Sequence, residues 1–249
     1  MDQAQSSLNR WKGCRIGITG ANGSLGKALT KRFIDKGAFV IGLTHRPITN
    51  ATKTTKGSQE WISWQCGQEN AIEETLKTLD ILVLNHGINP QGQQSSKALN
   101  EAIEVNALSC WRLMTLFENI AKEQTYPNCT REIWVNTSEA EIQPALSPGY
   151  EISKKLIGEL VSIRWNNLKK EERARLQIRK LVLGPFLSEL NPLGIMSADF
   201  VAKQIINQVE LGLKLIIITP NPITYIMMPL NEILRTVYSK LINKIYTNS

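Results

Sequence analysis

The stretch that decides the fold is Ile16-Gly17-Ile18-Thr19-Gly20-Ala21-Asn22-Gly23-Ser24-Leu25-Gly26. It predicts a short buried strand, a tight turn with three glycines, and a helix whose apolar residues recur at helical spacing. Glycines let the backbone approach a phosphate closely, and the unpaired N–H groups at a helix start attract an anion. An ordinary strand–loop–helix connection is the alternative. The position of the glycines between strand and helix favours a pyrophosphate site made by Gly20, Asn22, Gly23, Ser24, Leu25 and Gly26.

Predicted strands and helices alternate along nearly the whole chain. We expect strands at about 15–19, 39–43, 61–66, 80–84, 132–136, 177–183 and 214–219. After the first helix, we expect further helices at about 71–79, 97–123, 147–169 and 198–211. This alternation predicts an α/β fold: a single Rossmann-type, doubly wound parallel sheet of about seven strands with helices on both faces.

The chain divides into three parts. Residues 1–12 are expected to be a polar leader, residues 13–221 the nucleotide-binding domain with a built-in catalytic site, and residues 222–249 an amphipathic helical tail. The apolar residues of the tail from Leu230 to Tyr246 follow the spacing of one helix face. Two interpretations remain open. The tail is either a closing helix that packs on the core or on a second subunit, or a basic amphipathic helix that lies in a membrane interface.

The composition is that of a globular protein. The chain has 249 residues, of which 42% are hydrophobic, and a formal net charge of +7. This charge suits a phosphate-bearing ligand or an anionic membrane surface and does not by itself indicate nucleic acid, so we expect a small-molecule substrate and no nucleic-acid partner. The segment 164–180 contains seven Lys/Arg and two Glu, which we interpret as the solvated face and end of a helix.

The cysteines and the N-terminus bear on the compartment. The four cysteines have neither metal-ligand spacing nor the spacing of a disulfide framework, and His45 and His86 lie far apart, so we expect a reducing environment and no metal site. Residues 1–10 are polar, which argues against a signal peptide. No apolar run is long enough for a spanning helix. We expect a cytoplasmic protein with a peripheral membrane contact as an option for the tail.

A phenol and an ammonium lie four residues apart in Tyr150-Glu151-Ile152-Ser153-Lys154. On a helix both project from one face, where the ammonium stabilises the phenolate and makes the tyrosine a better proton donor or acceptor. Such a pair is common by chance, but other polar residues accompany it. They are Ser138, twelve residues earlier, Asn106 in the long predicted helix, and Asn85-His86-Gly87 at the end of the fourth strand.

Together with the glycine turn, these motifs resemble the short-chain dehydrogenase/reductase family, and the resemblance covers residues 13–219. The segment 184–199 is also similar to reductase domains found joined to sterol desaturase or fatty-acid hydroxylase-like domains. The spacing of Gly23 and Ser24 resembles the extended subfamily, whereas the chain length favours the classical type. The resemblance implies a nicotinamide cofactor, hydride transfer, and a homodimer or homotetramer assembled through the helices at 98–123 and 147–169.

Carried over residue by residue, the resemblance implies four catalytic residues. Tyr150 would exchange a proton with the substrate oxygen, and Lys154 would support it and hydrogen-bond the nicotinamide ribose. Ser138 would hold and polarise the substrate oxygen. Asn106 would keep a water in a proton relay beside Lys154.

The resemblance also implies cofactor contacts outside the glycine turn. Asn85 and Gly87 would line the adenine side, and Pro185 would lie against the nicotinamide. An enzyme that uses NAD usually offers a carboxylate after the second strand, whereas a basic residue accommodates the 2′-phosphate of NADP. Here that strand ends in Thr44-His45-Arg46, so Arg46 predicts NADP. The alternative is a merely solvated Arg46.

The sequence thus predicts an NADP(H)-dependent oxidoreductase that interconverts a carbonyl and an alcohol. The segment 185–197 is expected to roof the substrate, and its apolar residues favour a small, hydrophobic, lipid-like molecule. Two alternatives come from other classes: a non-catalytic NADP-binding regulatory or scaffold protein, and a membrane-peripheral module that acts through the tail. The co-occurrence of Asn106, Ser138, Tyr150 and Lys154 favours the enzyme.

Overall fold

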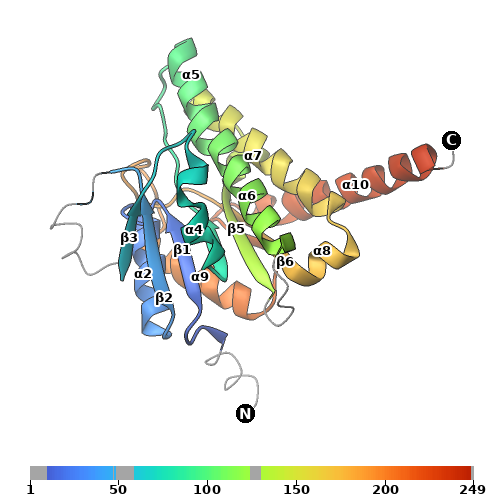
Figure 1. Ribbon diagram of the computed structural model, residues 1–249. Helices are drawn as coiled ribbons and strands as arrows, with labels where there is room; N and C mark the ends of the chain where they lie inside the picture. Colours follow the sequence, from blue (N-terminus) through green and yellow to red (C-terminus); the bar gives the residue numbers. More distant parts are fainter. Residues whose placement is uncertain (1–9, 47, 49–58, 124–129, 248–249) are drawn as a thin grey trace.

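The computed structural model describes residues 10–46, 48, 59–123 and 130–247. In this part of the chain seven strands form one parallel sheet in the order β3-β2-β1-β4-β5-β6-β7, which confirms the predicted doubly wound fold (Figure 1). The strands are β1 Arg15–Thr19, β2 Phe39–Thr44, β3 Glu60–Ser63, β4 Ile81–Leu84, β5 Arg131–Ser138, β6 Leu176–Leu183 and β7 Leu215–Ile218. The strand order reverses between β1 and β4, and ligands of such sheets bind at the carboxyl ends of the strands beside that point.

Helices cover both faces of the sheet. They are α2 Ser24–Asp35, α4 Glu73–Lys77, α5 Ser96–Ile103, α6 Ser109–Glu123, α7 Pro148–Asn167, α8 Lys170–Arg175, α9 Ala198–Glu210 and α10 Pro222–Thr247. Apolar residues of α4, α6 and α7 share one buried cluster with the sheet, and those of α2 and α9 share a second cluster on the opposite face. Since both faces are covered, the strands read as near-continuous apolar runs, such as the fully buried Ile81–Leu84.

Some predicted elements differ from the observed ones. The third strand, expected to reach residue 66, ends at Ser63, because its pairing partner β2 ends at Thr44 opposite Ser63. The helix expected at 97–123 is divided into α5 and α6 by a π-helical turn, Glu104–Leu108. Such turns are rare and often occur at functional positions, and this one contains Asn106.

The folded part begins before Gly13. Trp11, which we placed in the polar leader, is fully buried and packs against Phe33 and Trp134 with ring centroids 5.2 and 6.0 Å away. Its indole N–H donates to Glu210 Oε1 at 2.8 Å. Residues 1–9 of the expected leader lie outside the described residues.

The end of the basic segment 164–180 is not a solvated helix face. Arg179 and Lys180 lie on β6 and are buried. Arg179 Nε binds Glu132 Oε2 at 2.9 Å, and Lys180 Nζ binds Glu141 Oε2 at 2.6 Å and Glu232 Oε1 at 2.8 Å. The interpretation was wrong for these two residues because each positive charge is matched by a carboxylate distant in the sequence.

Helix α10 faces the protein with a mixed side, on which Met228 packs against Val182 and Ile217 between polar residues. Thr224, Met228 and Glu232 are buried, whereas large apolar residues on the opposite side are exposed. We call this exposed row the apolar arc: Ile223, Ile226, Leu230, Ile233, Val237 and Leu241. The predicted stripe therefore does not pack on the core of this chain within the described residues, and Figure 1 shows α10 leaving the body of the molecule toward the C-terminus. None of the described helices combines the length and apolarity that crossing a bilayer requires.

Replacing Trp11 by alanine is expected to lower the free energy of unfolding by about 3–5 kcal/mol, because it removes a fully buried aromatic side chain. Urea denaturation followed by circular dichroism measures the loss. Trp111→Ala, at a half-buried tryptophan on α6, is the matched control and should lose clearly less. Equal losses in the two variants would show that the N-terminal segment is not part of the core.

Candidate active site

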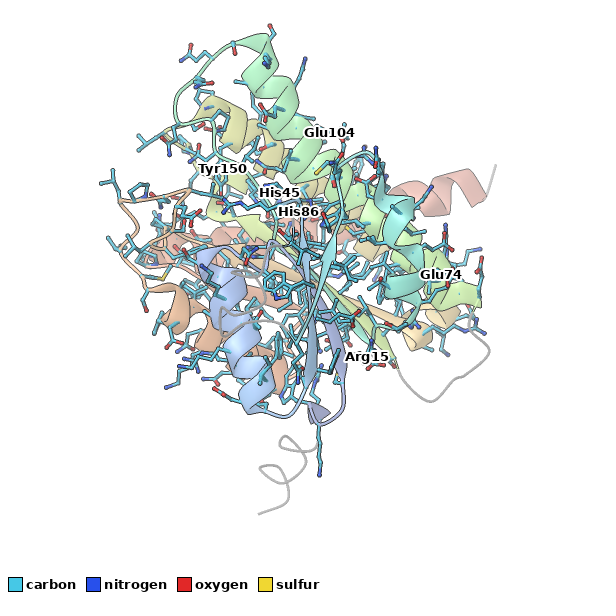
Figure 2. The ribbon with its side chains drawn as sticks, turned by 60° about the vertical axis from the view of Figure 1, so that its left-hand side comes forward. Arg15, His45, Glu74, His86, Glu104 and Tyr150 are labelled. Carbon is cyan, nitrogen blue, oxygen red and sulfur yellow. The ribbon has the colours of Figure 1, made fainter. Side chains whose placement is uncertain are left out.

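The candidate site residues lie at the carboxyl edge of the sheet, where the strands end and the helices α2 and α7 begin. His86 follows β4 and Tyr150 lies at the start of α7, and Figure 2 shows both at the same end of the sheet, whereas Arg15, the first residue of β1, lies at the other end. The sheet and the first turns of α2 and α7 therefore determine where the chemistry can occur.

The glycine turn is tightly packed. Gly20 has φ +65°, a left-handed conformation that favours glycine, and a Cβ there would come within 3.0 Å of His86 Cα. A Cβ on Gly26 would lie 2.3 Å from Gly20 O, so the helix can approach the turn only with glycine at this position. Helix α2 begins after Gly23, and no described side chain caps it. Its first N–H groups remain available for an anion, so this turn fits the pyrophosphate of a dinucleotide.

A hydrogen-bonded chain connects the ends of β1, β4 and β5. Thr19 Oγ1 accepts from the backbone N–H groups of Asn85 at 2.9 Å and His86 at 3.2 Å. The Asn85 side chain donates to Gly20 O at 3.4 Å and accepts from Asn136 Nδ2 at 2.9 Å. Asn85 is therefore held against the glycine turn. Gly87, two residues further, is close to Asn106, because a Cβ there would lie 3.0 Å from Asn106 Oδ1.

Lys154 extends this network of hydrogen bonds to α7. Its buried ammonium donates to Asn136 O at 3.0 Å and lies 5.7 Å from the centre of the Tyr150 ring. The spacing of four residues thus places the phenol and the ammonium on one helix face. Asn136 Oδ1 is buried and has no hydrogen-bond partner among the described residues, so a ligand donor at this edge could use it.

Ser138 is the last residue of β5, two residues beyond the predicted end of this strand. Its Oγ accepts from Ala140 N at 3.2 Å and caps the short helical turn Glu139–Glu141. Because this contact uses an oxygen lone pair, the hydroxyl proton remains available for a substrate oxygen.

Asn106 is buried in the π-helical turn and joins two segments of the site. Its Oδ1 accepts from Ile88 N at 2.7 Å, and its Nδ2 donates to Ile88 O at 2.9 Å and to Ser153 Oγ at 2.8 Å. These contacts fix the loop after β4 against α7. The contact on α7 is made by Ser153, the residue before Lys154. The structure thus brings Asn106 and Lys154 to the same region through Ser153.

Arg46 lies after β2, and its guanidinium is 63% exposed and 3.9 Å from the carboxylate of Glu189. Its backbone N–H donates to Thr44 Oγ1 at 3.1 Å, and Asn22 Nδ2 donates to the same oxygen at 3.5 Å. The end of β2 is thereby connected to the glycine turn. On the other side of the site, Pro185 O accepts from Ile195 N at 3.1 Å, which folds the segment after β6 back on itself.

His86 is a partly buried, neutral histidine. Its Nδ1 lies 2.8 Å from Thr19 Oγ1, its Nε2 lies 3.6 Å from Cys110 Sγ, and Trp64 packs on the ring at right angles. Burial, together with the positive charge of Lys154, lowers the pKa of His86 to about 3. Its ring therefore supports the turn after β4.

Sequence reasoning missed two residues that organise the site. Thr19 and Asn136 lie in predicted apolar strands and were treated as strand residues. The available signal was a hydroxyl or amide side chain at the carboxyl end of a strand that is otherwise apolar. At that edge a polar side chain can satisfy neighbouring backbone groups, as Thr19 does for Asn85 and His86.

The comparisons with known proteins agree with the fold and with a nucleotide-binding turn. Residues 16–161 match the NAD dependent epimerase/dehydratase family. The chain belongs to this family, whose cofactor class corresponds to the pyrophosphate-binding turn described above.

A comparison with a single relative is more specific than the family match. The chain is 41% identical over 237 residues to a monoglucosyldiacylglycerol epimerase of Synechocystis sp.. The match covers 94% of this chain and 56% of that protein, so the chain spans little more than half the length of this relative.

Two solved structures share the fold. A short chain dehydrogenase from Burkholderia cenocepacia, in complex with NADP, superposes with a TM-score of 0.73 at 15% identity and covers 88% of this chain and 92% of its own. The ligand-free aldohexose dehydrogenase of Thermoplasma acidophilum has a TM-score of 0.67 at 15% identity, with 84% and 93% covered. At this identity the likeness concerns the fold.

The low pKa of His86 predicts an acid-sensitive fold. The unfolded chain binds a proton at this residue below about pH 6.5, whereas the folded chain does so at about pH 3, so between these values the unfolded state binds more protons and stability falls as the pH falls. We expect His86 to contribute up to about 1.4 kcal/mol per pH unit. Denaturant titrations at pH values from 7 down to about 4.5 measure this slope.

The control is His86→Asn, in which no group titrates at this position. Its free energy of unfolding should depend less on pH over the same range. Parallel curves for the variant and the unchanged protein would contradict the assignment of a neutral histidine with a low pKa.

Proposed function

We propose that the chain is an NADP(H)-dependent oxidoreductase that interconverts an alcohol and a carbonyl, with the catalytic residues of a classical short-chain dehydrogenase. The observation that carries this proposal is the placement of Lys154. Its buried ammonium is fixed by Asn136 O beside the Tyr150 ring, on the strand whose last residue is Ser138. A phenol, an ammonium and a hydroxyl at the pyrophosphate-binding edge suit proton transfer coupled to hydride transfer.

Each proposed residue has one task. When an alcohol is oxidised, Tyr150 Oη takes the hydroxyl proton, and it returns this proton when the carbonyl is reduced. Lys154 stabilises the phenolate form by its charge, Ser138 donates a hydrogen bond to the substrate oxygen, and Asn106 keeps the water of a proton relay in place. The nicotinamide cofactor, when bound, supplies the acceptor and donor of the hydride that leaves or enters the same carbon.

Arg46 supports NADP as the cofactor. Arg46 follows β2, and its backbone N–H donates to Thr44 Oγ1, the hydroxyl that Asn22 of the glycine turn also contacts. No carboxylate belongs to Thr44-His45-Arg46 that could take the ribose 2′-hydroxyl of NAD. The contact of Arg46 with Glu189 is long and solvent-exposed, so a 2′-phosphate can replace it at little cost.

The identity to a monoglucosyldiacylglycerol epimerase supports a sugar hydroxyl of a diacylglycerol lipid as the reacting group. Epimerisation follows from the same chemistry if both half-reactions occur at one carbon. Oxidation removes a hydride and a proton, and reduction returns both, with the hydride entering from the opposite face, so no net oxidation results. A lipid of this kind also agrees with the hydrophobic substrate that the sequence favours.

The greater length of this relative leaves room for a further domain. The resemblance to reductase domains joined to desaturase- or hydroxylase-like domains supports the same arrangement. We propose that the chain supplies the redox part of such an assembly.

Tyr150→Phe should lower turnover of monoglucosyldiacylglycerol by at least about a thousandfold and leave NADPH binding within about twofold, because it removes the proton-transferring oxygen alone. Thin-layer chromatography or mass spectrometry of the lipid headgroup measures turnover, and fluorescence quenching measures binding. Tyr238→Phe, at an exposed tyrosine of α10 outside the row Ile223, Ile226, Leu230, Ile233, Val237 and Leu241, makes the same change, keeps the apolar ring, and is the matched control that should retain full activity.

Running the same reaction in D2O tests whether the hydrogen on the epimerised carbon moves as a hydride or as a proton. Hydride transfer predicts an epimerised carbon without deuterium, whereas one deuterium at that carbon would indicate proton abstraction and contradict the redox mechanism. Turnover retained in Tyr150→Phe would remove this tyrosine from its proposed role. Cofactor binding without turnover by the unchanged protein would favour the non-catalytic alternative.

A further inference from the structure

The orientation of α10 is fixed by the polar residues of its buried side. Gln143 Nε2 donates to Thr224 Oγ1 at 2.7 Å near the start of the helix. Further along, Glu232 accepts from Ser162 Oγ at 2.7 Å and pairs with the fully buried Lys180 at 2.8 Å. Breaking a buried ion pair is strongly destabilising. The apolar arc on the opposite side is therefore held outward by the fold.

The apolar arc is long and consists of large side chains. It extends from Ile223 to Leu241, about 27 Å along the helix axis at 1.5 Å per residue. Ile226, Ile233 and Val237 expose 69%, 59% and 50% of their surface. A contiguous apolar surface of this kind on a soluble domain indicates an interaction site.

The positive charge near the apolar arc indicates the kind of partner. Helices α7 and α10 run side by side in the same direction, because Glu232 contacts Ser162 and Thr236 contacts Asn166. The exposed Lys169 and Lys170 follow the end of α7, and the exposed Lys240 follows on α10. Glu171 and Glu172 adjoin the two lysines after α7, so Lys240 is the lysine that borders the arc itself. An apolar row bordered by a lysine, on a chain of net charge +7, complements the hydrocarbon and the phosphates of an anionic bilayer.

The apolar arc begins close to the candidate site. Gln143, which holds Thr224, lies in the loop between Ser138 and Tyr150. The same loop carries the exposed Leu146, and the segment after β6 carries the exposed Leu193 and Ile195. A membrane that contacts the arc and these loops would present its headgroups to the carboxyl edge of the sheet.

We propose that α10 lies on the surface of an anionic lipid bilayer through the apolar arc, with Leu146, Leu193 and Ile195 contacting the same surface. The site then works on headgroups of lipids that remain in the membrane. This inference rests on the proposed function for its substrate, whereas the contact itself requires no turnover. The helix lies in the interface and does not span the bilayer.

Sedimentation of the full chain with lipid vesicles tests the inference. We expect binding to vesicles of phosphatidylcholine mixed with phosphatidylglycerol, and weaker binding to phosphatidylcholine alone. The double variant Ile233→Glu/Val237→Glu should lower the partition coefficient by at least about tenfold, because it places two charges in the apolar arc. The matched control is Leu211→Glu/Leu213→Glu, at two exposed leucines between α9 and β7, which makes the same charge change and should bind as the unchanged protein does.

Three results would overturn the inference: no vesicle binding by the unchanged chain, equal losses in the two double variants, or a dimer in light scattering that Ile233→Glu/Val237→Glu dissolves. The last result would assign the arc to a second copy of the chain. NADPH titration of the same samples separates this inference from the proposed function. Vesicle binding without cofactor binding would contradict only the function, and cofactor binding without vesicle binding would contradict only the membrane contact.

Discussion

The candidate site depends on the hydrogen bond from Lys154 to Asn136 O. A buried ammonium needs partners, and here it obtains one from β5, at the residue after the last one that pairs with β4. The same asparagine holds Asn85, which contacts the glycine turn at Gly20. One network of hydrogen bonds thereby fixes the proton-transferring side of the site relative to the phosphate-binding side. Both sides lie where a parallel sheet reverses its strand order and leaves a crevice for a ligand.

Buried ion pairs extend this organisation beneath the site. Lys180 on β6 joins Glu141, three residues after Ser138, to Glu232 on α10. A helix that leaves the body of the molecule is thus connected to the short helical turn that directly follows the proposed catalytic residue Ser138. The ion pairs specify which side of α10 faces the protein, and in doing so they leave the apolar side exposed to a partner.

Much of this arrangement could be predicted from the sequence because it depends on local patterns. The alternation of apolar strands and helices predicted the fold, and the spacing of Tyr150 and Lys154 predicted a shared helix face. The contacts of Thr19, Asn136 and Lys180 could not be predicted, because each joins segments far apart in the sequence. The tail shows the limit most clearly: its periodicity predicted an amphipathic helix, but the partners of Glu232 decided which side is buried.

The most direct test is a titration of the purified chain with NADPH and with NADH, followed by quenching of tryptophan fluorescence. The account predicts saturable binding of NADPH at least about tenfold tighter than binding of NADH, and a loss of this preference in Arg46→Ala, because the guanidinium would bind the 2′-phosphate. Binding of neither nucleotide, despite a folded protein, would contradict the assignment of the glycine turn and of the site built around it.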